Sequence, residues 1–225
     1  MSLPSVQEFR RRVENVNEEP IRFCLMTLYL FCGRISEAVA LAYKTDKTVA
    51  RGPRGTDARL DVYRVGSMEF PVVVFTVKTA KRQGLERKVA VPADPAYEPW
   101  AQPVYEYFKQ HGQQYVFPFT QQHVRYRCSK LEVFKGLTYT IETYPIWKNG
   151  VVVRRVERYS RPFTLHAIRH LRASELVDYY GFTGGDLAVY GGWTFHTMLF
   201  PAATDRYLSL GWQTYFPKLL KVALR

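Results

Sequence analysis

The sequence predicts one α+β domain in which helices surround a small antiparallel sheet. Both ends of the chain carry apolar residues at helical spacing, whereas the middle carries short valine-rich runs bounded by turn residues. The composition is typical of a globular protein, with 47% apolar and 23% charged side chains. A chain of 225 residues can enclose a sizeable core, so we expect a single domain over residues 1–225.

The first half of the chain is expected to alternate from helices to strands and back to a helix. Apolar periodicity predicts helices over residues 4–18, 20–32, 34–43 and 96–111. Valine-rich runs predict strands over residues 58–65, 70–79 and 86–92. The last two strands are joined by the basic segment "AKRQG", which we expect to be a hairpin tip.

The second half begins with a predicted β-hairpin over residues 139–159. Asn149 and Gly150 stand between two β-rich runs, which is a strong signal for a tight hairpin turn. The outgoing strand carries Arg154 and Arg155, which form either a basic ribbon along DNA or an ordinary solvated strand face. Helices are then expected over residues 165–180, 184–190, 196–209 and 213–223.

Net charge indicates the class of partner. The formal charge of +12 favours a polyanion, for which nucleic acid is the first expectation. The most apolar run, residues 23–32, is too short to span a bilayer, and the N-terminus lacks the apolar segment of a signal peptide. We therefore expect no membrane association and a cytoplasmic, nucleoid-associated protein.

Cysteine and carboxylate patterns argue against a metal centre. Cys24, Cys32 and Cys128 are odd in number and form no Cys-x-x-Cys pair, so we expect reduced core residues and neither a disulfide framework nor a zinc site. The sequence shows no cluster of carboxylates that would bind a divalent cation. We expect no metal and no cofactor.

Two basic motifs are candidates for chemistry. Thr164 is a suitable N-cap for a helix, and His166 and Arg169, three residues apart, would share one side of its first turn. Free backbone N–H groups at such a helix start favour an anion, for example a phosphate, although both side chains could also be ordinary surface residues. Near the N-terminus, Arg34 in "GRISE" follows an apolar segment, and Glu37 is placed to pair with it. That pair is either purely structural or holds the arginine in a fixed pose.

The order of these motifs resembles that of a known family. Gly-Arg-x-x-Glu at residues 33–37 is followed by a hairpin lysine, His-x-x-Arg, Gly-Gly-Trp at 191–193 and a tyrosine. Over residues 4–222 this order resembles the catalytic domain of tyrosine recombinases, the superfamily that includes integrases of phage and archaeal mobile elements. The resemblance implies a mostly helical catalytic domain with a small antiparallel sheet, to which the hairpin at 139–159 is an extra insertion. Members carry a further N-terminal core-binding domain, which we expect to be absent or removed here.

The resemblance also implies roles at a DNA phosphate. Arg34 and Arg169 would clamp the non-bridging oxygens, because arginine stays protonated and forms bidentate contacts. Glu37 would support Arg34. His166 would hydrogen-bond the phosphate or assist proton transfer, with His170 in a supporting position.

The remaining catalytic positions follow from the same resemblance. Lys78 on the hairpin would protonate the leaving 5′-oxygen, with Lys81 as a second candidate. Trp193 would donate its indole N–H to the phosphate or pack against the segment that carries the nucleophile. That nucleophile is expected to be Tyr207, with Tyr215 as its rival.

These roles predict a site-specific DNA recombinase or integrase that cleaves and rejoins strands through a covalent 3′-phosphotyrosyl intermediate. Its partners would be double-stranded DNA and further copies of itself, as a dimer or tetramer on DNA. A type IB DNA topoisomerase and a non-catalytic DNA-binding protein of the same fold remain alternatives. Basic side chains outside the reacting centre are expected to contact DNA, namely Lys81, Arg82, Arg87, Arg154 and Arg155.

Overall fold

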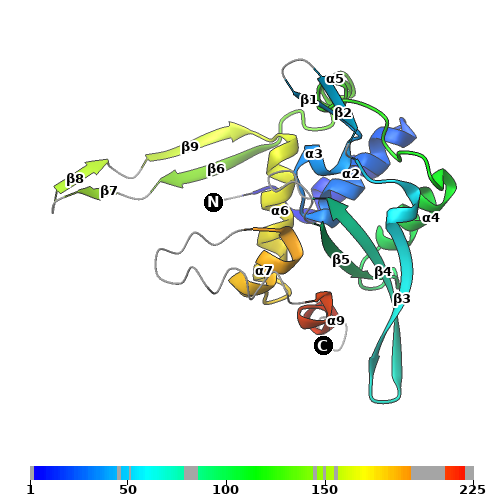
Figure 1. Cartoon of the computed structure of the whole chain (residues 1–225). Coiled ribbons are helices and arrows are strands. Elements are labelled where there is room, and N and C mark those ends of the chain that lie inside the picture. The colour runs from blue at the N-terminus through cyan, green and yellow to red at the C-terminus, as the bar shows by residue number, and fades with distance from the viewer. Residues whose placement is uncertain are drawn as a thin grey trace.

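The computed structural model combines helices with antiparallel strands, which confirms the expected mixture (Figure 1). It describes residues 3–44, 47–50, 52–78, 86–143, 146–148, 151–154, 157–193 and 211–220. Every strand pairing among these residues is antiparallel. The helices lie around one three-stranded sheet, and three two-stranded pairings lie outside it.

The first half of the chain holds most of the sheet. Its helices are α1 (Val6–Glu14), α2 (Glu19–Phe31), α3 (Ile35–Ala38), the 3-10 turn η1 (Gly55–Asp57) and α4 (Ala101–His111). Its strands are β1 (Leu41–Lys44), β2 (Lys47–Ala50), β3 (Ala58–Val65), β4 (Met68–Lys78) and β5 (Glu86–Pro92).

The second half begins with a helix and a long hairpin and then becomes helical. Its strands are β6 (Thr138–Thr143), β7 (Ile146–Lys148), β8 (Val151–Arg154) and β9 (Glu157–Pro162). Its helices are α5 (Gln121–Lys130), α6 (Leu165–Asp178), α7 (Gly184–Gly191), the 3-10 turn η2 (Trp212–Thr214) and α9 (Phe216–Leu220).

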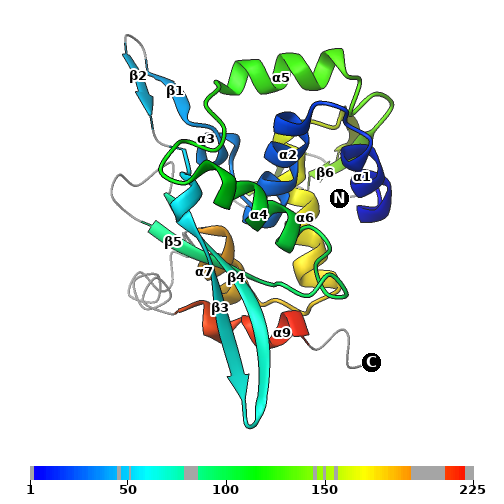
Figure 2. The same ribbon diagram turned by 90° about the vertical axis from the view of Figure 1, so that its right-hand side faces the viewer.

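The sheet has the order β3-β4-β5; its inner part is covered on both faces, whereas the tip of the β3-β4 hairpin projects beyond the helices (Figure 2). On one face, Phe75 of β4 packs edge-on against Phe31 of α2 and Phe108 of α4, with ring centroids 5.4 and 5.3 Å apart. On the other face, Tyr63 of β3 packs against Trp212 and Phe216. Coverage on both sides explains why β4 carries a run of buried valines rather than an alternating pattern.

Local prediction succeeds for the sheet and fails after α3. The strands expected over 58–65 and 86–92 occur at those residues, and the one expected over 70–79 is β4. The helix expected over 34–43 is wrong beyond Ala38. There Val39 is extended, and the N–H of Ala40 donates to the carbonyl of Phe117 at 2.9 Å, so a tertiary hydrogen bond replaces a helical one. Residues 41–44 then pair with β2.

The second half contains one helix that apolar periodicity did not predict. That helix is α5, whose N-cap Thr120 accepts the N–H of His123 on its hydroxyl at 3.1 Å. The strands expected around Asn149-Gly150 are present as β6 with β9 and β7 with β8, although the turn itself lies outside the described residues. This arm projects from the body and leads directly into α6 (Figure 1). The helix expected over 196–209 also lies outside the described residues, and the one expected over 213–223 is the short η2 and α9.

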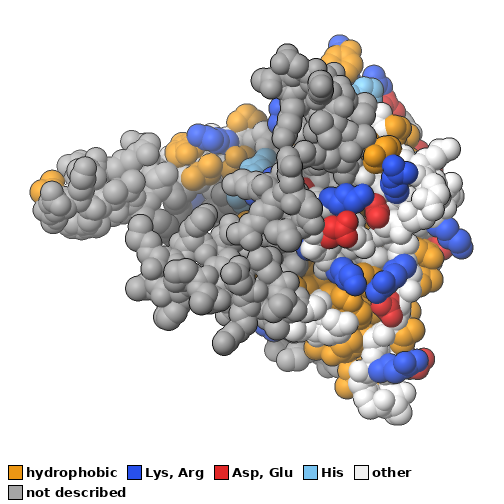
Figure 3. Space-filling model, viewed as in Figure 1, with side chains coloured by type: hydrophobic (Ala, Val, Ile, Leu, Met, Phe, Trp, Pro, Cys, Tyr) orange, Lys and Arg blue, Asp and Glu red, His pale blue; other side chains and the backbone are white. Residues whose placement is uncertain are grey.

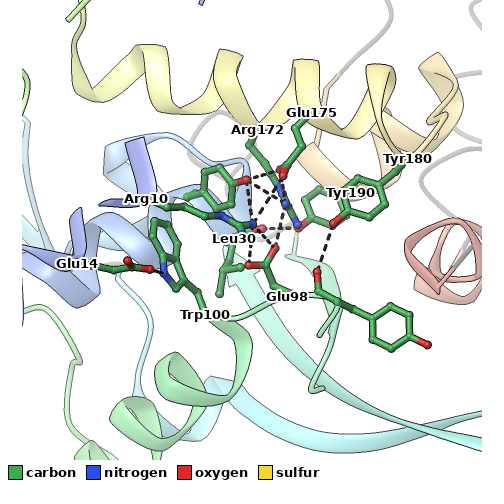
Figure 4. Close-up of polar contacts among 11 residues, drawn as sticks. Arg10, Glu14, Leu30, Glu98, Trp100, Arg172, Glu175, Tyr180 and Tyr190 are labelled. Atoms are coloured by element: carbon green, nitrogen blue, oxygen red, sulfur yellow. Dashed lines mark hydrogen bonds and ion pairs between the residues drawn. The ribbon is translucent and has the colours of Figure 1, made fainter. Parts of the chain in front are cut away.

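Helix α6 is fixed to the other helices by a buried ionic network (Figure 4). The guanidinium of Arg172 lies 3.0 Å from a Glu98 carboxylate oxygen and 2.5 Å from one of Glu175. Tyr29 of α2 donates its hydroxyl to Glu175, and Arg10 of α1 donates to Glu98 at 3.1 Å. Both Arg172 and Glu98 are almost completely buried, so removing either partner would leave an uncompensated charge. The network therefore sets the position of α6, and with it the first turn of that helix.

The described residues bear on two further expectations. The three cysteines are buried and free, as expected for core residues. Among the helices of these residues, none combines the length and the apolar character that crossing a bilayer requires.

Candidate functional site

The starts of α3 and α6 meet at one cavity. Arg34 is the N-cap of α3, and His166 is the second residue of α6; both line a cavity of about 780 Å³. Burial lowers the pKa of His166, and the nearby charges of Arg169 and Arg34 lower it further, which leaves the imidazole neutral at pH 7. The ring of His170 lies edge-on to that of His166, with centroids 4.9 Å apart. Two segments far apart in the sequence therefore bring these predicted residues together.

Arg169 is almost completely buried. It is only 2% exposed, its Nη2 donates to the carbonyl of Gly191 at 3.1 Å, and its guanidinium lies 4.0 Å from the ring centroid of Trp193. Its Nη1 is buried and has no hydrogen-bond partner among the residues that the structure describes. Burial, together with the charges of Arg34 and Arg87, lowers the pKa of Arg169 to about 10, so it remains a cation at neutral pH. A buried cationic donor without a partner is costly, and an anion placed against it would remove that cost.

The carboxylate of Glu37 contacts both Arg34 and Arg87. It lies 3.5 Å from Nη1 of Arg34 and 3.0 Å from Nη2 of Arg87, and it accepts the backbone N–H of Arg34 at 3.1 Å. Burial opposes its ionisation, but the charge of Arg87 and the bond from Arg34 outweigh burial and hold the pKa of Glu37 below its usual range. Gly33 leaves room for this carboxylate, because a Cβ there would lie 3.0 Å from Glu37 Oε2.

Arg87 is not a surface DNA contact, contrary to the prediction from its sequence. It is 8% exposed and lies between the Glu37 carboxylate and the carbonyl of Tyr190, to which it donates. The expectation is wrong because Arg87 shares a strand face with Val89 and Val91, both fully buried. The period-2 pattern of "ERKVAVP" carried this signal, and Arg87 belongs to the site as an internal support.

Lys78 lies at the rim of the sheet, next to Arg87 in the hairpin. It ends β4 opposite Glu86, one position beyond the pair Val77–Arg87. Its side chain is 44% exposed, and its Nζ lies 4.0 Å from Asp57 Oδ2. The contacts of the described residues do not join Lys78 to Arg34 or Arg169. Lys81 and Arg82 lie outside the described residues.

Trp193 is held against Arg169 by the glycines before it. A Cβ on Gly191 would lie 2.1 Å from the indole ring, and Gly192 ends α7 in the left-handed conformation with φ of 67°. The tryptophan therefore covers one face of the Arg169 guanidinium, an arrangement that favours a cation.

The structure describes only one of the two candidate nucleophilic tyrosines. Tyr207 lies outside the described residues, as does Arg155. Tyr215 is fully buried, accepts the N–H of Ala90 at 2.8 Å and donates to the carbonyl of Lys88 at 3.3 Å. Burial raises the pKa of Tyr215, so its hydroxyl is a structural group that bonds the backbone of β5.

Of the two arginines predicted to contact DNA from the outgoing hairpin strand, the structure describes Arg154, whose backbone ends β8 on the arm.

Comparisons with known proteins add no family assignment. No family model, curated protein or solved structure matches this chain. Within the described ranges, no group of three or more His, Cys, Asp or Glu side chains is placed to hold a metal ion. What the arrangement can do chemically follows from its own charges: Arg34 and the neutral His166 line a cavity that suits a phosphate, and the cation of the buried Arg169 lies close to His166.

Proposed function

We propose that this protein is a tyrosine recombinase that cleaves and rejoins DNA strands through a covalent 3′-phosphotyrosyl intermediate. The observation that carries the proposal is that Arg34 and His166 line one cavity within electrostatic reach of Arg169, whose buried Nη1 has no hydrogen-bond partner among the described residues. The motif order had assigned these three residues to one phosphate, although they come from opposite halves of the chain.

The two arginines would stabilise the charge that builds up on the phosphate during attack. Glu37 orients Arg34, and Trp193 with the Gly191 carbonyl orients Arg169, so neither guanidinium needs to reorganise when charge develops. Loss of one such oriented donor costs roughly 3–4 kcal/mol of transition-state stabilisation, or two to three orders of magnitude in rate.

The covalent step exchanges one phosphate ester for another. The Tyr207 oxygen attacks phosphorus, the bond from phosphorus to the 5′-oxygen breaks, and a 3′-phosphotyrosyl ester forms. The tyrosyl proton passes to a base, for which the neutral imidazole of His166 is suited. Lys78 supplies the proton that the leaving 5′-oxygen takes. Attack by a 5′-hydroxyl from another strand reverses these transfers and completes the exchange.

Positive charge would hold the duplex over this site. The chain carries 32 Lys and Arg against 20 Asp and Glu. Over the described surface in Figure 3, several of the basic side chains lie beside acidic ones, which neutralise part of their charge locally. We assign duplex binding to the remaining excess, including Lys81, Arg82, Arg154 and Arg155, and infer that copies of the chain assemble as a dimer or tetramer on DNA.

The test is to trap and map the covalent adduct. The protein is incubated with pooled random-sequence duplexes that carry a nick, so that cleavage releases a short strand and cannot be reversed. Denaturation followed by mass spectrometry of the DNA–peptide adduct should identify Tyr207. Tyr207→Phe should bind DNA and form no adduct, whereas Tyr215→Phe should still form it. Adduct formation by both variants would refute the assignment of Tyr207.

A plasmid relaxation assay, run beside the adduct experiment, separates the alternatives. The arginine clamp suits a type IB topoisomerase equally well, and relaxation of a supercoiled plasmid without strand exchange would favour that enzyme. DNA binding by the wild-type chain without any adduct would favour a non-catalytic DNA-binding protein of the same fold.

A further inference from the structure

The cavity beside the phosphate position is larger than one phosphate needs. It lies between α5 and the starts of α3 and α6, and its volume is about 780 Å³, within the range of pockets that enclose small organic ligands. Its apolar wall includes Phe134 and Phe163, whose ring centroids lie 5.4 Å apart, and Leu165. We call this cavity the α5 pocket.

The α5 pocket also carries polar groups suited to the edges of a nucleotide. Gln121 and Ser129 of α5 offer amide and hydroxyl groups, and Arg125 brings a cation to the same helix face. Aromatic side chains, hydrogen-bonding groups and cations together are the features that proteins use to bind an unstacked base with its phosphates.

The pocket and the phosphate position share two residues. Arg34 and His166 line the pocket, and both belong to the proposed phosphate site. A phosphodiester held by Arg34 therefore places an adjoining nucleotide at the mouth of the α5 pocket. A base inside a duplex has its faces stacked and its edges paired, so only an unpaired base can enter a concave pocket.

We propose that the α5 pocket binds an unpaired nucleobase of the DNA, next to the phosphate that Arg34 and Arg169 hold. The inference rests on the proposed function and adds a substrate feature to it: the preferred DNA is distorted beside the cleaved bond, with one base outside the stack.

The test compares two duplexes that differ by one extrahelical thymidine. Their affinities for the full chain are measured by fluorescence anisotropy at one fixed salt concentration. The wild-type chain should prefer the bulged duplex by at least about fivefold, the lower end of what one base–aromatic stack contributes. Ser129→Tyr, which fills the pocket from an exposed position of α5, should abolish the preference. Gln122→Tyr, exposed on α5 but outside the pocket lining, should retain it.

Photocrosslinking locates the base directly. With 5-iodouracil at the extrahelical position, the crosslink should map to the peptide that contains Phe134. Equal affinity of the wild-type chain for both duplexes, equal effects of the two tyrosine variants, or a crosslink only to other peptides would overturn the inference. The adduct assay is run on the same samples: an adduct without any bulge preference refutes the pocket alone, whereas a bulge preference without an adduct refutes the recombinase chemistry and supports the pocket.

Discussion

Replacement of Glu37 by glutamine tests whether the interior of the site is held by charge. The variant keeps the shape of the side chain and an oxygen that can accept the Arg34 N–H. It removes the negative charge that lies 3.0 Å from Nη2 of Arg87, a residue that is 8% exposed and whose Nε has no hydrogen-bond partner in the described part of the chain. Breaking a buried ion pair by neutralising one partner costs about 3–5 kcal/mol. That is a large fraction of the roughly 5–15 kcal/mol by which domains are stable.

The assay is urea denaturation followed by far-UV circular dichroism at pH 7. We expect Glu37→Gln to lower the free energy of unfolding by about 3–5 kcal/mol with an unchanged denaturant slope. Glu8→Gln is the control, because Glu8 pairs with Arg11 and Arg12 on the surface of α1. This variant should lose far less free energy of unfolding. Adding Arg87→Met to Glu37→Gln should restore part of the stability, since it removes the uncompensated cation.

The pH dependence supplies a second measurement with a definite sign. The pKa of Glu37 is depressed in the folded protein, so its contribution to stability is fully present above the ordinary carboxyl value of 4.5 and is lost as the pH falls through the folded value. The loss of wild-type stability below pH 4.5 should therefore be steeper than that of Glu37→Gln. Two outcomes would refute the charge-based reasoning. One is that Glu37→Gln is as stable as Glu8→Gln. The other is that adding Arg87→Met to Glu37→Gln lowers the free energy of unfolding further, by about 3–5 kcal/mol.

Three further predictions concern neighbouring positions. Gly191→Ala should displace Trp193, because the new Cβ would lie 2.1 Å from its ring; tryptophan fluorescence should shift and adduct formation should fall at least tenfold, and an unchanged spectrum would contradict this. Tyr215→Phe leaves the N–H of Ala90 buried without its partner, so thermal or urea unfolding should show a loss of about 1–3 kcal/mol while adduct formation persists. His170 has a pKa lowered by burial and then by its histidine neighbour, so the wild-type protein should lose stability as the pH falls below 6.5 and through the folded pKa. His170→Gln should flatten that part of the stability profile, and an unchanged profile would argue against the packing described.

Periodicity in the sequence was sufficient to predict secondary structure where the residues of a segment determine its conformation by themselves. The strands at 58–65 and 86–92 and the helix at 20–32 were predicted within a residue or two, because valine runs, turn residues and apolar spacing act locally. Motif order also selected Arg34, His166 and Arg169; the first two line one cavity, and the charge of the buried Arg169 is close enough to affect the pKa of His166. Motif order could select these residues because a phosphate site requires cationic side chains in any fold.

Tertiary contacts decided what local pattern could not. "AVALAY" after Ser36 and Glu37 suits a helix, but the buried Ala40 N–H finds its acceptor on Phe117, far along the chain, so the segment is extended. Arg87 looked like a surface cation because its neighbours in the sequence are charged. Its burial is decided by Glu37 and the Tyr190 carbonyl, which reach it only in the folded chain and supply the charge and the acceptor that a buried guanidinium needs.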